Sequence, residues 1–264
     1  MFNVFLLFCI PFAIIGYIVF VWQWGKNSQK FYPNNKPFIF GHRGSPTHIT
    51  ENTLASFEKA IEKGVDGLEF DVRLSKDKKI IIFHDADLKR LAGVNKKIQE
   101  LTFSQLQEIE LKQNQTIPLL DDFAHFLDKI KAVNIEIKSN GILKGHNIIK
   151  PLIQFLDKHN INEKCIVSSF NPLILLRLKL KRPKTIIGYL YNRNMIFHPW
   201  NNLVWICRIR PDNLHIHHSL LNSWIVKWAR GKRMKINSYT INDKNVFENV
   251  KIDGVFTDNI EYLK

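Results

Sequence analysis

Cysteine is scarce in this chain, with only Cys9, Cys165 and Cys207 among its 264 residues. Three cysteines so far apart give no disulfide framework, and this composition is compatible with a reducing compartment. Internal repeats and low-complexity tracts are lacking as well. The length of 264 residues suits a single domain.

Acidic residues are in deficit, with 24 Asp and Glu against 38 Lys and Arg, and the formal net charge is +14. Between Arg177 and Lys235, Asp212 is the only acidic residue. Such a basic surface suits an anionic membrane or a nucleic acid. The chain has no nucleic-acid-binding motif, so we favour the membrane and expect no nucleic-acid partner. A solvated basic face is the alternative.

Charged side chains are missing from residues 2–22, which are almost wholly apolar. About 20 such residues span a bilayer, and Trp22 and Trp24 lie where interfacial aromatic residues are expected. No Lys or Arg precedes the run and no cleavage site is evident, which argues against a signal peptide. We therefore predict a transmembrane anchor over residues 1–24 and a polar linker over 25–36.

Basic residues follow the apolar run, at Lys26, Lys30 and Lys36. An excess of Lys and Arg marks the cytoplasmic flank of a membrane-spanning helix. We therefore expect a single-pass membrane protein with its catalytic domain in the cytoplasm.

Apolar strand candidates alternate with helical stretches through the rest of the chain. The expected strands cover 38–41, 67–72, 133–138, 165–170, 185–190, 213–217, 235–241 and 254–257. The expected helices include 51–63, 146–159, 171–181, 220–231 and 243–250. This alternation predicts a TIM-type (β/α)8 barrel, which we place at residues 37–264. Residues 73–118 interrupt the alternation and are predicted to form a small insertion after the second strand, on the carboxyl face.

The first two strands end in residues that suit chemistry. The first runs into a Gly-His-Arg-Gly turn, which presents His42 and Arg43 at its carboxyl end. On the second strand, Glu69 and Asp71 are two residues apart and point to the same face. Two carboxylates on one face repel each other unless a positive charge lies between them. A divalent cation with oxygen ligands is the usual solution.

Two later strands repeat this arrangement. One apolar run ends in His84-Asp85, and a further strand carries Glu136 and Lys138 on one face. Asp85 either orients His84 or caps the following turn. Three carboxylates from two strands therefore predict a site for a hard metal ion.

These residues resemble the signature of the glycerophosphodiester phosphodiesterase family. The resemblance spans about residues 37–260. Its motifs are His42-Arg43-Gly44, Glu51-Asn52-Thr53, Glu69-Phe70-Asp71-Val72, Ile81-Ile82-Phe83-His84-Asp85, Ile135-Glu136-Ile137-Lys138, Ser168-Ser169-Phe170 and Thr257-Asp258.

The resemblance implies a division of roles. The ligands of a divalent metal, Ca²⁺ or Mg²⁺, would be Glu69, Asp71 and Glu136. His42 and His84 would be the general acid/base pair, because histidine titrates near neutral pH. Arg43 would hold an oxygen of the anionic phosphodiester, and Lys138 would add positive charge nearby.

Two segments depart from the family pattern. Tyr239-Thr240-Ile241-Asn242 stands where the family often has Trp-Thr-x-Asn, and Asn259-Ile260 follows Asp258 where a proline is common. We place both segments away from the metal site, where they would affect substrate preference more than chemistry.

Residues 191–210 are apolar and include Trp200 and Trp205, with arginines on both sides. As a loop after the fifth barrel strand, they could dip into a membrane interface or line a slot for an acyl chain. The alternative is a barrel helix that packs inward.

We therefore predict a metal-dependent hydrolase that converts glycerophosphodiesters to sn-glycerol 3-phosphate and an alcohol. The first alternative is a lysophospholipase D that acts at the membrane with the same residues. The second is a binding module on a barrel that has lost catalysis.

Overall fold

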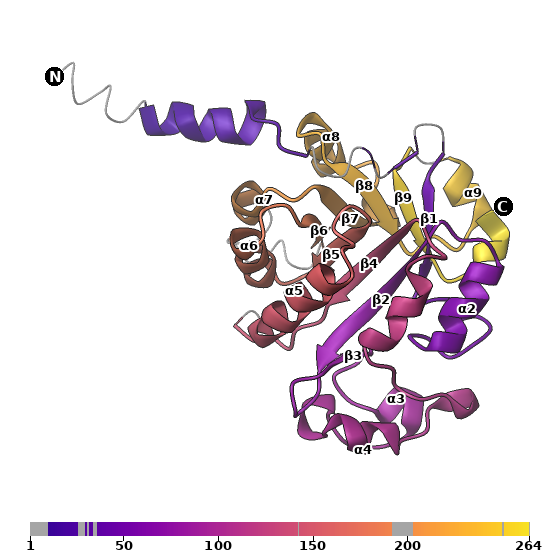
Figure 1. Cartoon of the computed structure of the whole chain (residues 1–264). Helices are drawn as coiled ribbons and strands as arrows, with labels where there is room; N and C mark the ends of the chain where they lie inside the picture. The colour runs from indigo at the N-terminus through magenta and orange to yellow at the C-terminus, as the bar shows by residue number, and fades with distance from the viewer. Residues whose placement is uncertain are drawn as a thin grey trace.

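The computed structural model describes residues 10–25, 30, 32–33, 36–141, 143–191, 203–249 and 251–263. In this part of the chain, eight parallel strands form a closed ring, because β1 (Phe38–His42) pairs with both β2 (Gly67–Leu74) and β9 (Gly254–Thr257) (Figure 1). The strands between them are β4 (Ala132–Ile137), β5 (Cys165–Ser169), β6 (Ile186–Tyr191), β7 (Asn213–His217) and β8 (Lys235–Tyr239). The predicted TIM-type barrel is confirmed.

Helices surround the strands, as Figure 1 shows. The main ones are α2 (Leu54–Glu62), α5 (Ile149–Lys158), α6 (Pro172–Lys181), α7 (Leu203–Ile209), α8 (Trp224–Gly231) and α9 (Lys244–Glu248). Short 3-10 turns are η4 (Asp121–Phe126), η5 (His146–Ile148), η7 (His218–Leu220) and η8 (Ile260–Leu263). The strands read as near-continuous apolar runs because helices outside and side chains inside bury both of their faces.

The start of α2 differs from the sequence prediction in a way that matters for the site. The helix was expected from residue 51, but it begins at Leu54 with Thr53 as its N-cap, whose hydroxyl accepts from the Ser56 backbone N–H. Asn52, which directly precedes the N-cap residue Thr53, has a φ of 58°, in the left-handed region that Asn tolerates better than most residues. Glu51 and Asn52 are therefore outside the helix and available to the site.

The predicted insertion after the second strand has its own small core. The strand β3 (Ile80–Ile82) pairs antiparallel with the end of β2. The rest consists of α3 (Lys89–Ala92), η2 (Ile98–Glu100), α4 (Phe103–Gln107) and η3 (Lys112–Asn114). Buried side chains such as Phe83, Leu88 and Leu106 form a cluster separate from the barrel core. The insertion thereby fixes the chain at His84, which follows β3 closely.

The N-terminal helix extends away from the barrel in Figure 1. It covers residues 10–16 and continues as η1 (Tyr17–Val21), and Phe12 is 74% exposed. Its end contacts the barrel, where the Trp228 indole N–H donates to the Val19 carbonyl at 2.8 Å. Among the described residues, no helix is both long and apolar enough to cross a membrane. Residues 1–9 of the predicted anchor, which was placed at residues 1–24, lie outside the described part.

Two further expectations meet the structure here. In the predicted linker, Tyr32 is buried, and its hydroxyl donates to Asn213 Oδ1 at 2.7 Å, so this part of the linker packs against the barrel. In the segment 191–210, residues 203–209 form α7, with Ile206 and Ile209 buried. That part of the segment is an inward-packing helix, while Trp200 lies outside the described residues.

Candidate active site

The strands β2 and β4 bring the three predicted metal ligands together, and the end of β1 places His42 beside them. Strand register aligns His42 with Glu69 and Asp71 with Glu136. Carboxylate oxygens of Glu69, Asp71 and Glu136 all lie within 4.8 Å of one another. Alternation along β2 and pairing with β4 therefore produce the predicted convergence, because side chains at matched register share a face.

Burial makes this cluster electrostatically demanding. Burial, followed by the charge of Asp71, raises the pKa of Glu69 to about 8. Burial also raises the pKa of Glu136. Burial opposes ionisation of Asp71 too, but Lys138 and Arg43 outweigh it and hold the pKa of Asp71 below its usual range. The protein alone thus provides too little positive charge to ionise all three acids. A divalent cation that prefers oxygen ligands would supply the missing positive charge.

Arg43 lies in the turn after β1 and binds two of the three predicted metal ligands, Glu69 and Asp71. Its φ of 56° turns the chain so that its backbone N–H donates to Glu69 Oε2 at 3.0 Å. Its guanidinium contacts Glu51 Oε1 at 2.8 Å through Nη1 and Asp71 Oδ2 at 3.3 Å through Nε. Asn52 holds Asp71 as well, because its amide donates to Asp71 Oδ2 at 2.9 Å. Arg43 and Asn52, whose backbones lie in the left-handed region, therefore orient the carboxylates of β2.

Lys138 is the other cation at the cluster, just beyond the end of β4. Its Nζ lies 3.0 Å from Asp71 Oδ1 and also hydrogen-bonds Glu136. The prediction that Lys138 places positive charge beside the carboxylates agrees with this geometry.

His42 is held by a residue from the far end of the chain. Its Nδ1 lies 2.6 Å from Asp258 Oδ1, and its Nε2 lies 3.9 Å from Glu69 Oε2. Burial disfavours the protonated ring, but the hydrogen bond to Asp258 and the charge of Glu69 outweigh burial and raise the pKa of His42. Asp258 therefore fixes the ring orientation and increases the basicity of the free Nε2 side.

His84 faces the same cavity with a partner of its own. Its Nδ1 lies 2.6 Å from Asp85 Oδ1, and Asp85 also accepts from Arg90 Nε at 2.7 Å. Of the two roles predicted for Asp85, orientation of His84 is the one that the contacts support. Burial is the main cause that lowers the pKa of His84, with Lys138 and Arg43 acting in the same sense.

A cavity of about 240 Å³ joins these groups. The predicted residues that line it are His42, Arg43, Glu69, His84, Glu136 and Lys138. Tyr239 and Thr240 line it too, which corrects our placement of that segment away from the metal site. The strand β8 lies far from Glu69 in sequence, but the ring brings its carboxyl end to the same opening.

Sequence reasoning missed several residues of the site. Asp258 was noted as part of a motif but given no role, and Glu51, Asn52 and Arg90 were given none either. Glu51 accepts from Arg43 and from Arg90 at 2.6 Å, so it ties the first turn to the insertion. The Glu-Asn-Thr motif was the available signal, because Glu51 and Asn52 belong to the family motif and stand directly before the helix N-cap Thr53.

The fold and the site together define a class of protein. A (β/α)8 barrel presents its chemistry at the carboxyl ends of its strands, and here that end carries three carboxylates that could hold a metal ion, beside an Arg, a Lys and two imidazoles. Metal and guanidinium neutralise phosphoryl oxygens, and imidazoles move protons. This combination suits hydrolysis of a phosphodiester with the help of a divalent metal.

Comparison with known proteins identifies the family. The model of the "Glycerophosphoryl diester phosphodiesterase family" matches residues 42–262. A protein from Caldanaerobacter subterraneus subsp. tengcongensis, named glycerophosphodiester phosphodiesterase, is 30% identical over 239 residues, which cover 86% of this chain and 96% of the relative. The chain therefore belongs to the glycerophosphoryl diester phosphodiesterase family, and it is a hydrolase of glycerophosphodiesters.

Solved structures agree with this assignment. A glycerophosphodiester phosphodiesterase from Thermotoga maritima is 32% identical with a TM-score of 0.72, over 87% of this chain and 97% of that one. A phosphodiesterase from Oleispira antarctica, solved in complex with the product sn-glycerol-3-phosphate, is 28% identical with a TM-score of 0.74, over 88% and 95%.

Proposed function

We propose that this chain hydrolyses glycerophosphodiesters to sn-glycerol 3-phosphate and an alcohol, with the metal held by Glu69, Asp71 and Glu136. One observation carries the proposal: oxygens of three buried carboxylates lie within 4.8 Å of one another, and two of these residues, Glu69 and Glu136, line a cavity together with both histidines. The sn-glycerol-3-phosphate bound to the Oleispira antarctica relative supports the assignment of the product.

The all-oxygen ligand set favours Ca²⁺ or Mg²⁺ over softer metals. When bound, such an ion would neutralise phosphoryl oxygens and stabilise the charge that develops on them. Arg43 and Lys138 stand beside the ligands and would bind the remaining phosphate oxygens. Because both cations already contact Asp71, they are oriented before substrate arrives.

The two imidazoles divide the proton transfers. Hydrolysis requires the attacking water to lose one proton and the leaving alkoxide to gain one. Asp258 makes His42 the stronger base of the pair, which suits it to accept the first proton. Burial makes His84 the stronger acid, which suits it to donate the second. Each ring keeps its Nδ1 on a carboxylate, so each would act through Nε2.

Turnover of glycerophosphocholine tests the proposal. We expect glycerol 3-phosphate to be released by the purified full chain, to stop when a chelator is added, and to resume with Ca²⁺ or Mg²⁺. The same ion should raise the unfolding temperature, since a ligand that binds only the folded state stabilises it. An ion that stabilises the chain while no glycerophosphodiester is turned over would favour the binding module instead.

A second candidate is a lysophospholipase D activity. Proteins named lysophospholipase D from mouse and human are 26% and 27% identical to this chain, over 216 and 215 residues. They cover 73% and 71% of this chain, which covers 68% and 64% of them. Release of choline from lysophosphatidylcholine at a rate near that from glycerophosphocholine would support it.

We also propose that the apolar N-terminal run anchors the enzyme to a membrane, with the barrel on the cytoplasmic side. The exposed apolar side chains of residues 10–21 support this, because Phe12, Ile15 and Val21 are each more than half exposed. Sedimentation with membranes and release only by detergent would be expected. Extraction by carbonate or salt alone would contradict an anchor.

A further inference from the structure

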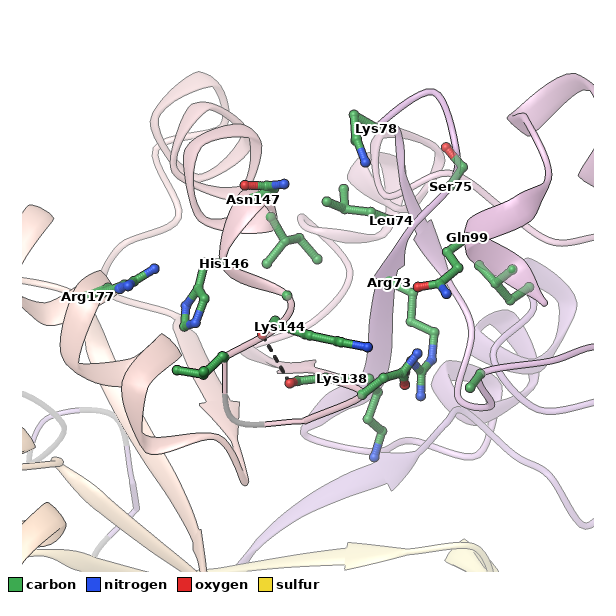
Figure 2. Close-up of a pocket in the computed structure, with 17 residues that line it drawn as sticks. Arg73, Leu74, Ser75, Lys78, Gln99, Lys138, Lys144, His146, Asn147 and Arg177 are labelled. Carbon is green, nitrogen blue, oxygen red and sulfur yellow. Dashed lines mark hydrogen bonds between the residues drawn. The ribbon is translucent and has the colours of Figure 1, made fainter.

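A second pocket lies beside the active-site cavity and is lined by basic side chains (Figure 2). It has a volume of about 420 Å³ and lies between the β2–β3 hairpin and the turn that precedes α5. Its cationic residues are Arg73, Lys78, Lys138, Lys144 and Arg177. Among the described residues that line it, none is Asp or Glu. Figure 2 shows Lys144 reaching towards the strand that carries Arg73.

Most charges of this basic pocket have no ion pair in the described part of the chain; Lys138 is the exception, because its Nζ pairs with Asp71 and Glu136. Within the described part of the chain, Lys78, Lys144 and Arg177 make no ion pair with a carboxylate. Arg73 is held by uncharged oxygens, because it donates to the His84 carbonyl at 2.8 Å and to Asn140 Oδ1 at 2.9 Å. Cations gathered without counter-charge repel one another and attract anions.

The basic pocket and the active-site cavity share a wall. Lys138 lines both. Arg73 joins them as well, because the carbonyl that it binds belongs to His84. The two spaces therefore adjoin on the His84 side, where we place proton donation to the leaving alcohol.

We propose that the basic pocket binds an anionic group, a phosphate, carried by the alcohol part of the substrate. The chain would then select glycerophosphodiesters whose alcohol bears a second negative charge over those with a neutral or cationic alcohol. This specificity rests on the proposed phosphodiesterase function and names its substrate class. Lysine acts on phosphate as a point charge and arginine as a fork of donors, so the pocket suits a phosphate.

Three substrates separate the alternatives. Glycerophosphocholine has a cationic alcohol, glycerophosphoglycerol a neutral one, and bis(glycerophospho)glycerol one that carries a second phosphodiester. We expect kcat/KM for bis(glycerophospho)glycerol to exceed that for glycerophosphoglycerol by roughly tenfold at low salt, after allowing for its two ester ends. Screening should reduce the preference as salt rises, because the Debye length shortens to about 8 Å at 0.15 M.

A double variant tests the pocket itself. Lys78→Gln with Lys144→Gln removes two exposed charges from the pocket and leaves the catalytic residues unchanged. We expect it to lose most of the roughly tenfold preference while glycerophosphoglycerol turnover stays within about twofold. The matched control is Lys89→Gln with Lys150→Gln, which removes two exposed charges from α3 and α5 outside the pocket and should keep the preference.

Each outcome is decisive. Equal kcat/KM for the three substrates, or a preference that the control loses as fully as the pocket variant, would overturn this inference and leave the phosphodiesterase function standing. No turnover of any of the three would overturn both. Modulation of glycerophosphocholine turnover by inorganic phosphate, in the parent and not in the pocket variant, would assign the pocket to free phosphate and overturn the substrate assignment.

Discussion

Both ends of the barrel carry carboxylates, and the two groups have opposite surroundings. At the amino ends, Asp66, Asp212 and Asp253 each precede a strand and accept from a backbone N–H of the neighbouring strand. Each also pairs with a lysine; the pairs are Lys131 with Asp66 at 2.7 Å, Lys179 with Asp212 at 3.2 Å and Lys235 with Asp253 at 3.0 Å. Each of these three carboxylates therefore has a lysine as a local partner.

The carboxylates at the other end converge instead of spreading out. Glu69, Asp71 and Glu136 share the two cations Arg43 and Lys138, and burial raises the pKa of both glutamates. The comparison teaches that the residue type does not decide the role of a barrel aspartate or glutamate. An acid that accepts a hydrogen bond from the neighbouring strand and pairs with a lysine stabilises the fold. Buried acids that have too few positive charges around them favour the binding of a cation.

The largest test of this comparison is Glu136→Gln. The change removes one metal ligand at constant shape, so we expect kcat/KM for glycerophosphocholine to fall by about a thousandfold or more. The free energy of unfolding without metal should not fall, because burial already disfavours the charge of Glu136. Urea denaturation and a steady-state assay measure the two effects. Clear destabilisation with activity kept would show that the carboxyl end is structural.

The opposite pattern is expected for Asp212→Ala at the amino end. The change leaves the Ile187 backbone N–H without its carboxylate and Lys179 without its partner. We expect a loss of about 3 kcal/mol in the free energy of unfolding, as when one partner of a buried pair is removed, with kcat/KM kept within about twofold. The measurement is again urea denaturation with the steady-state assay.

Asp121→Ala is the matched control for that change. Its ion pair with Lys158 lies on the surface, where Asp121 is 61% exposed. Removing such a pair should cost no more than about 1 kcal/mol. Equal losses for Asp121→Ala and Asp212→Ala would remove the special role that we give the amino-end aspartates.

Much of the fold and of the metal site could be predicted because the signals are local. Alternation along one strand places Glu69 and Asp71 on one face, and the carboxyl ends of parallel strands meet, so Glu136 joins them. The strand boundaries were predictable for the same reason: buried parallel strands are apolar runs that end in polar turns.

Asp258, one of the residues that were missed, depends on closure of the ring. His42 and Asp258 are 216 residues apart in sequence, and only the pairing of β1 with β9 brings their elements together. The basic pocket escaped prediction likewise, because Arg73 and Lys144 come from separate elements outside the region between Arg177 and Lys235 where the basic excess was noted. Contacts of this kind require the three-dimensional register of strands, which local patterns do not specify.

The smallest effect, and the sharpest test within the carboxyl end, is the pH dependence of Asp258→Asn. Asp258 raises the pKa of His42, so the amide should lower it. Because the pKa of His42 is raised and that of His84 is lowered, the alkaline limb of the kcat/KM profile follows His42 and the acidic limb follows His84. A lower pKa of His42 then moves the alkaline limb to lower pH and leaves the acidic limb in place. If His42 is the base, the plateau between the limbs should rise as well, because a larger share of the enzyme has His42 deprotonated while His84 is protonated. A moved alkaline limb with an unchanged plateau would exchange the roles of His42 and His84, and a profile without any shift would mean that Asp258 only holds the ring in place.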